Sequence, residues 1–263
     1  MEEFKEEVIF MQKDGIVTLT INRPEERNML SDKALEKLFD HIQGLNQDNA
    51  VRVVIIRGEG TEFFCGGIFN PLQMSQLSSE QIRYRRRRGN DLFDKIEALT
   101  HPVIAAINGR AQAGGFELAL ACDMRIAAAH ATFAMPENTW GMFPGAGGPI
   151  RLPRLVGSGK AMEIIMTGRD VGADEALRIG LIEQVVQRES FAAEIQHLAE
   201  AIAASGPLGN RAVKKLVRAS CEVDTRMARA YSDSLREPLA TSADTAEGIA
   251  AYREGRKPRF HGR

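Results

Sequence analysis

The sequence has little cysteine and no histidine pattern suited to a metal. Its three cysteines, Cys65, Cys122 and Cys221, are scattered through 263 residues. Because the cysteines are so few and so widely spaced, a disulfide framework and a cysteine-based zinc site are excluded. The low cysteine content also favours a reducing, cytoplasmic compartment. The five histidines lack ligand spacing as well. We therefore expect no metal.

Charge of one sign and long apolar runs are also lacking. The 34 Lys and Arg residues and the 35 Asp and Glu residues leave a formal net charge of −1. Without a basic field, nucleic acid is not an expected partner. No segment approaches the roughly 18 consecutive apolar residues of a membrane span. The acidic segment 1–7 has no apolar stretch typical of a signal peptide, so neither a leader nor a membrane partner is expected.

The first two thirds of the chain alternate strand and helix signals. Asp14-Gly15 predicts a hairpin, Ser31 a helix start, and Ser78 with Gln81 a capping box. Short apolar runs predict buried strands at four places: 51–57, 103–107, 124–127 and 182–186. This alternation favours an α/β fold with parallel strands, and it would also fit a doubly wound sheet. No internal repeat is visible.

The pattern changes near residue 190 to almost continuous helix. The expected helices are 191–204, 207–219, 221–236 and a last one opened by Thr241 and ending near Gly255. No low-complexity linker separates the two parts.

Two glutamates beside glycines are the main chemical signal. Gly114-Gly115 lie at the start of an apolar helical run, where backbone N–H groups have no internal partner. Glycine lets a ligand oxygen approach such donors, which can stabilise negative charge during a reaction. Glu117 falls in the first helical turn, and Glu137 arrives from the next segment. This pattern predicts an oxyanion site with two carboxyl groups.

Four segments in register resemble the crotonase family, the enoyl-CoA hydratases and isomerases. They are 107–119, 64–68, Pro136-Glu137 and 143–148. The resemblance implies a spiral of ββα units, with a core at 1–195 that holds coenzyme A and the active site. It also implies a helical region at 196–263 that forms a trimer or a dimer of trimers. Coenzyme A would be part of an acyl-CoA substrate, and no separate cofactor is expected.

The same resemblance implies roles for single residues. Glu117 and Glu137 match the two catalytic glutamates, and the N–H groups of Ile68 and Gly114 match the oxyanion donors. Retention of both glutamates favours a hydratase that converts a 2-enoyl-CoA into a 3-hydroxyacyl-CoA. The alternatives are an isomerase, a cyclic dienoyl-CoA hydratase, and a non-catalytic homologue that binds coenzyme A or RNA.

Substrate contacts are expected at both ends of the thioester. Arg27 resembles the loop that borders the nucleotide of coenzyme A. Lys257 and Phe260 resemble the family's closing segment, which would reach the nucleotide bound by a neighbouring subunit. A solvated arginine and a frayed basic tail are the alternative interpretations.

The acyl pocket departs from the family pattern after Gly66-Gly67. Phe69 stands where the family usually has an aspartate, and Asn70 followed by proline predicts a shifted N-cap. We assign Gly66, Phe69 and Asn70 to the substrate pocket together with Trp140 and expect a narrow, aromatic wall. Such a wall favours flat, conjugated or cyclic acyl groups.

The run Arg85-Arg86-Arg87-Arg88 lies on an expected helix, where only some of the four can face one direction. It is either a solvated face or a contributor to binding anionic coenzyme A.

Overall fold

The larger of two sheets is almost entirely parallel. The computed structural model describes residues 6–263, with the side chains of residues 71, 73 and 75 left out. The strand order is β1-β2-β3-β5-β7-β10, and only β1 and β2 pair in antiparallel fashion. The strand bounds are β1 Val8–Lys13, β2 Ile16–Ile21, β3 Val53–Gly58, β5 Val103–Ile107, β7 Met124–Ala128 and β10 Gln184–Val186.

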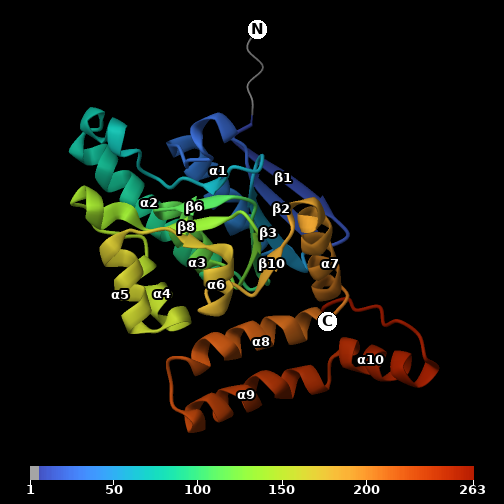
Figure 1. Ribbon diagram of the computed structural model, residues 1–263. Helices are drawn as coiled ribbons and strands as arrows, with labels where there is room; N and C mark the ends of the chain where they lie inside the picture. The colour runs from blue at the N-terminus through green and yellow to red at the C-terminus, as the bar shows by residue number, and fades with distance from the viewer. Residues whose placement is uncertain (1–5) are drawn as a thin grey trace.

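A smaller sheet and a set of helices complete each turn of a spiral (Figure 1). This sheet has the order β4-β6-β8-β9, with bounds β4 Phe63–Cys65, β6 Arg110–Gln112, β8 Thr132–Ala134 and β9 Val171–Gly172. The chain passes from β3 to β4 to α2 (Ser79–Ala98), and then from β5 to β6 to α3 (Gly114–Ala121). It next passes from β7 to β8 to α4 (Gly148–Val156). The structure therefore confirms the predicted ββα spiral and excludes a single doubly wound sheet.

Both faces of the large sheet are buried at its central strands β3 and β5. Successive side chains of a strand point to opposite faces, so neighbouring residues enter different clusters. Val54 and Ile56 of β3 join the main core, which includes residues of α1 (Asp32–Leu45), α2 and α3. Val53 and Ile55 join a second cluster that contains Ile195 of α7 (Phe191–Ala203). These strands therefore appear in the sequence as continuous apolar runs.

Local sequence signals fix several element ends as predicted. Asp14 and Gly15 have φ angles of 51° and 80°, which suit the turn of the β1–β2 hairpin. The Ser31 side chain caps α1 by accepting from the Ala34 N–H. Ser78 and Gln81 form the capping box of α2.

The C-terminal helices differ from the prediction at two starts. α9 (Thr225–Ala240) begins after its N-cap Asp224, so the expected start at Cys221 was wrong. α10 (Ala243–Glu254) is capped by Ser242 instead of Thr241. The remaining bounds are α5 Ser158–Thr167, α6 Ala173–Arg178, α8 Pro207–Ser220, and the 3₁₀ helices η1 Pro24–Glu26, η2 Pro71–Gln76, η3 Pro136–Trp140 and η4 Arg188–Ser190.

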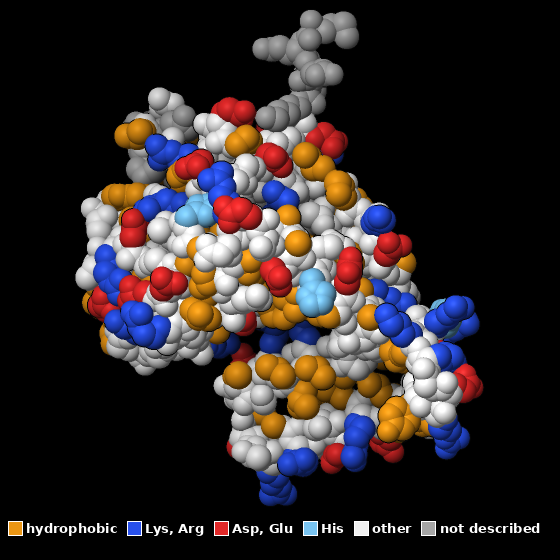
Figure 2. Space-filling model, turned by 45° about the vertical axis from the view of Figure 1, so that its right-hand side comes forward, with side chains coloured by type: hydrophobic (Ala, Val, Ile, Leu, Met, Phe, Trp, Pro, Cys, Tyr) orange, Lys and Arg blue, Asp and Glu red, His pale blue; other side chains and the backbone are white. Residues whose placement is uncertain are grey.

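Helices α8, α9 and α10 form a layer beside the spiral (Figure 1). The predicted division after residue 195 falls inside α7, which packs on the large sheet, so the separate layer starts with α8. Exposed hydrophobic side chains gather on this layer (Figure 2): Val213, Val217, Met227, Tyr231, Ile249 and Tyr252. Among residues 6–263, no helix combines the length and apolar composition needed to cross a bilayer.

Candidate active site

One cavity of about 400 Å³ brings together six of the residues singled out in the sequence. It lies where α2, α3, η2, η3 and the loop after η3 meet. The six are Ile68, Phe69, Gly114, Glu117, Glu137 and Trp140. The same cavity is lined by Phe143, the first residue of the segment 143–148 that carries part of the family resemblance.

The backbone segments that carry the N–H groups of Ile68 and Gly114 lie close together beside the cavity. An added Cβ at Gly114 would lie 3.2 Å from the Ile68 nitrogen, and one at Gly67 would lie 3.2 Å from the Gly114 nitrogen. Gly67 has a φ of +109°, and its carbonyl accepts from the Leu30 N–H at 2.9 Å, which holds the loop in place. Within the described residues, neither N–H donates to another group. The two donors can therefore bind one oxygen of a ligand.

Glu117 is held by backbone donors. Its side chain is 3% exposed, and its Oε1 accepts from the N–H groups of Ala146 and Gly148, each at 2.8 Å. Burial raises the pKa of Glu117, whereas these two hydrogen bonds and the charge of Arg151 oppose the rise. The anion of Glu117 is thus buried but stabilised by specific partners.

Glu137 has no comparable pair of donors from other described residues. It is 7% exposed, and its Oε2 is buried with no hydrogen-bond partner among the described residues. Burial, followed by the charge of Glu117, raises the pKa of Glu137 from 4.5 to about 7. Because two nearby carboxylates repel each other, we place the proton of the pair on Glu137, whose anion is stabilised, in the described part of the chain, only by its own backbone N–H.

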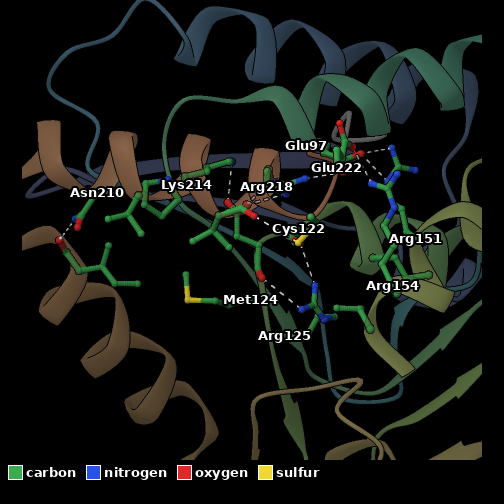
Figure 3. Close-up of a pocket in the computed structure, with 18 residues that line it drawn as sticks. Glu97, Cys122, Met124, Arg125, Arg151, Arg154, Asn210, Lys214, Arg218 and Glu222 are labelled. Atoms are coloured by element: carbon green, nitrogen blue, oxygen red, sulfur yellow. Dashed lines mark hydrogen bonds and ion pairs between the residues drawn. The ribbon is translucent and has the colours of Figure 1, made fainter. Parts of the chain in front are cut away.

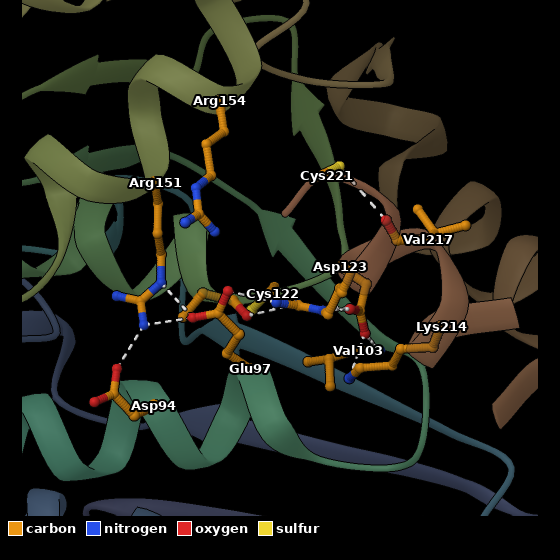
Figure 4. A network of polar contacts seen from close by, with 12 residues as sticks. Asp94, Glu97, Val103, Cys122, Asp123, Arg151, Arg154, Lys214, Val217 and Cys221 are labelled. Carbon is orange, nitrogen blue, oxygen red and sulfur yellow. Dashed lines mark hydrogen bonds and ion pairs between the residues drawn. The ribbon is translucent and has the colours of Figure 1, made fainter. Parts of the chain in front are cut away.

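A buried arginine, Arg151, supports the loop that holds Glu117, and Figure 4 shows its pairs with Asp94 and Glu97. Arg151 is 7% exposed and donates to the Ala146 carbonyl at 3.0 Å, while the Ala146 N–H donates to Glu117. Its guanidinium is paired with Asp94 and Glu97 of α2. Gly147 must be glycine here, since a Cβ would lie 1.9 Å from Arg151 Nη1.

The ion-pair network continues from Glu97 to the C-terminal helices. Glu97 accepts from Arg218 of α8 at 2.6 Å, and Arg218 also pairs with Asp123. Lys214 pairs with the same Asp123 at 2.7 Å. The loop that holds Glu117 is therefore linked through side chains to the position of α8.

A second cavity of about 440 Å³ lies between α8 and the core (Figure 3). Its charged groups, including Lys214, Arg218, Arg125 and Arg154, are paired with neighbouring carboxylates. Its carboxyl groups, Glu97, Asp123 and Glu222, are each held in ion pairs with an arginine. The cavity with the glutamate pair is thus the better candidate for chemistry.

Five of the predicted substrate contacts lie outside the lining of the candidate cavity, as far as the described residues show. Arg27 and Gly66 bond to each other, the Gly66 N–H donating to the Arg27 carbonyl at 2.9 Å. The Asn70 side chain caps η2 by accepting from the Leu72 N–H, which confirms the predicted N-cap. Lys257 is exposed, and the Phe260 carbonyl accepts from Arg52. Their contact with substrate stays a prediction.

Sequence reasoning assigned no pocket role to several residues that line the cavity: Met74, Asn90, Ala113, Gly141, Met142, Gly145 and Ala146. It named Arg86 only as one of the four consecutive arginines, without placing it in the cavity. The spacing of Arg86 and Asn90, four apart on one helix, was the available signal. The role of the Ala146 and Gly148 N–H groups had no side-chain signal. In the described part of the chain, no cluster of three or more His, Cys, Asp or Glu residues is placed to hold a metal ion.

Comparison with known proteins gives consistent matches along the chain. The family model described as Enoyl-CoA hydratase/isomerase matches residues 11–263. The chain is 38% identical over 255 residues to the crotonyl-CoA hydratase of Syntrophomonas wolfei, covering 97% of this chain and 98% of that protein. It is 35% identical over 252 residues to the short-chain-enoyl-CoA hydratase of Clostridium acetobutylicum, covering 95% of each. The crystal structure of an enoyl-CoA hydratase from Bacillus anthracis superposes with a TM-score of 0.95 at 36% identity, covering 98% of this chain and 100% of that one.

Proposed function

The chain belongs to the enoyl-CoA hydratase/isomerase family, and from this premise we propose that it adds water across the 2,3 double bond of a 2-enoyl-CoA. The product is a 3-hydroxyacyl-CoA. The observation that carries the proposal is the pair of buried carboxyl groups in one cavity, beside two neighbouring N–H groups that have no acceptor among the described residues.

The substrate is activated at its carbonyl oxygen. When water adds to the β carbon, electron density moves to the thioester oxygen and an enolate forms. The N–H groups of Ile68 and Gly114 stabilise this oxygen as its charge grows, and one such donor is worth about 2.7–4 kcal/mol where it has been removed by mutation. The enolate then takes a proton at the α carbon.

The two glutamates divide the proton transfers. Glu117, whose anion accepts two backbone hydrogen bonds, takes a proton from the attacking water. Glu137, whose pKa is raised to about 7, gives its proton to the α carbon. The net reaction forms one C–O bond and one C–H bond and breaks the C=C π bond and one O–H bond of water. It leaves Glu117 protonated and Glu137 ionised, so a proton must return from Glu117 to Glu137, directly or through solvent, before the next turnover.

Removal of either carboxyl group tests this division. We expect Glu117→Gln and Glu137→Gln each to lower turnover of crotonyl-CoA by about 100-fold or more, measured as loss of the enoyl absorbance. Glu194→Gln, at an exposed position of α7, is the matched control. Normal hydration by either cavity variant would remove that residue from the mechanism. Retained double-bond migration in Glu137→Gln would favour an isomerase with a single base.

We also propose a homo-oligomer, a trimer or a dimer of trimers, acting in the cytoplasm. The exposed hydrophobic side chains of α8–α10 favour burial against other copies. The buried thiols of Cys65 and Cys122, with no disulfide between them, fit a reducing compartment. Arg27, Lys257 and Phe260 are proposed contacts for coenzyme A, the last two across subunits.

A further inference from the structure

The four consecutive arginines of α2 have different surroundings in the structure. Arg85 pairs with Asp32 of α1, and Arg88 pairs with Glu36 and lies over the Phe39 ring. Arg86 instead lines the cavity that holds the two glutamates. Helical geometry explains the separation, since residues three apart share a face and neighbours do not.

Arg86 is a cation without a partner. Its exposed side chain makes no hydrogen bond or ion pair with any other residue that the structure describes. Because it is exposed and also lines the cavity, it lies at the rim. An arginine in this setting is free to bind an anionic group of a ligand in the cavity.

Asn90, one turn further along α2, faces the same cavity with an unsatisfied group. Its Oδ1 is buried and has no hydrogen-bond partner in the described part of the chain. Between the two, α2 closely approaches the proposed oxyanion loop: a Cβ at Gly89 would lie 2.4 Å from Ile68 Cδ1. Asn90 and Arg86 therefore extend from the reaction centre toward the rim, along one helix face.

Arg86 does not serve the catalytic carboxyl groups. Among the described residues no hydrogen bond or ion pair joins it to Glu117 or Glu137, and the arginine that supports the loop around Glu117 is Arg151. The phosphates of coenzyme A are also unsuitable partners, because the long pantetheine arm separates them from the thioester. The remaining candidate for Arg86 is the far end of the acyl group.

We propose that Arg86 and Asn90 form a subsite for an acyl group that ends in a carboxylate, so that the substrate is the monothioester of an unsaturated dicarboxylic acid. The proposal rests on the proposed function, since it places an enoyl thioester in this cavity. Arg86 pairs with the carboxylate, and the Asn90 amide, in either orientation of its O and N atoms, hydrogen-bonds to the polar end of the acyl chain.

Binding of saturated thioesters, which cannot be hydrated, tests the subsite independently of catalysis. Succinyl-, glutaryl- and adipyl-CoA are titrated against analogues in which an isopropyl group replaces the carboxylate. We expect about tenfold tighter binding of at least one carboxylate over its analogue, as for a charge-assisted hydrogen bond at a partly exposed site. The preference should decrease with added salt.

Three variants complete the test. Arg86→Gln should abolish the preference while leaving the neutral analogue bound as before, and Asn90→Asp should weaken the carboxylates alone by repulsion. Arg87→Gln, whose arginine is exposed and lies 3.9 Å from Asp91, should change neither. Equal binding of both series by the native protein would overturn the proposal. An equal loss of both series in Arg86→Gln, with weaker binding of coenzyme A itself, would overturn it in favour of a contact with coenzyme A. Native hydration of crotonyl-CoA in either case would leave the proposed function intact.

Discussion

Gly114→Ala should abolish most of the activity while leaving the fold nearly unchanged. The added methyl group would lie 3.2 Å from the Ile68 nitrogen, beside the cavity and close to both N–H groups. It would therefore occupy the position that we assign to the thioester oxygen. Loss of one oxyanion donor lowers turnover by about 10²–10³-fold in a measured case, and we expect a decrease of at least that size.

The same substitution should cost little stability. Gly114 is the first residue of α3 and its φ is not positive, so alanine fits the backbone. Its other close neighbours are Ile68 Cγ1 and Cδ1, at 3.2 and 3.4 Å, and they belong to a flexible side chain. Replacing glycine in a helix gains about 0.5–1 kcal/mol, which offsets part of this crowding. We expect the free energy of unfolding to change by less than about 1 kcal/mol.

Two other glycines serve as controls. A Cβ at Gly115 would lie 2.0 Å from the Cys65 carbonyl oxygen, so Gly115→Ala should destabilise the fold itself. Nothing lies within 4 Å of a Cβ at Gly44 in α1, so Gly44→Ala should be slightly more stable and fully active. Urea unfolding and crotonyl-CoA hydration are measured for all three variants. Near-normal turnover of a folded Gly114→Ala protein would refute the assignment of the oxyanion site.

Further predictions concern stability, support and assembly. Ionisation of buried Glu137 costs stability as pH rises, because its pKa is about 7 in the folded protein and 4.5 ordinarily. Glu137→Gln avoids this cost, so its free energy of unfolding relative to the native protein should increase by roughly 3 kcal/mol between pH 4 and 8, as measured by urea unfolding. A difference that stays constant with pH would contradict the assigned pKa. Arg151→Met should release the loop around Glu117 and lower kcat by about tenfold or more. The pH profile of kcat/KM should shift to higher pH, because a cation that lowers the pKa of Glu117 is lost. An unshifted profile would leave Arg151 a purely structural role. Deletion from Thr241 onward should dissociate the oligomer and weaken coenzyme A binding together, as sedimentation and titration would show, and an unchanged oligomer with unchanged affinity would disprove it. Trp140→Ala should lower kcat/KM for cyclic enoyl-CoA more than for crotonyl-CoA, by about tenfold. An unchanged ranking, with crotonyl-CoA best, would show that the aromatic lining of the cavity does not select cyclic acyl groups.

Structural features that depend only on neighbouring residues could be predicted from the sequence. Ser31 and the Ser78–Gln81 pair mark helix starts because a cap satisfies donors within the same turn. The glycines beside Glu117 mark a helix start open to a ligand for the same local reason. The starts of α9 and α10 were predicted at other residues, because several polar residues near Asp224 and Ser242 can also serve as an N-cap.

The spiral itself left no repeat in the sequence. Each turn of the spiral adds one strand to the large sheet and one to the small sheet. The strands of different turns pack against different helices and strands, so each turn uses different apolar residues. The fold was predicted through the resemblance of four motifs, whereas residue periodicity alone also fitted a doubly wound sheet.

Tertiary structure decided which charged groups belong to the site. The donors to Glu117 are backbone N–H groups 29 and 31 residues away, which no side-chain pattern reveals. The four arginines of α2 look alike in sequence, yet α1 supplies carboxylates to Arg85 and Arg88, and the cavity meets Arg86. Sequence determined the helix on which they lie and their angular spacing. The packing of α1 and α3 against α2 decided which arginines contact a carboxylate and which one lines the cavity. Such contacts join residues far apart in the sequence, so they depend on the path of the whole chain.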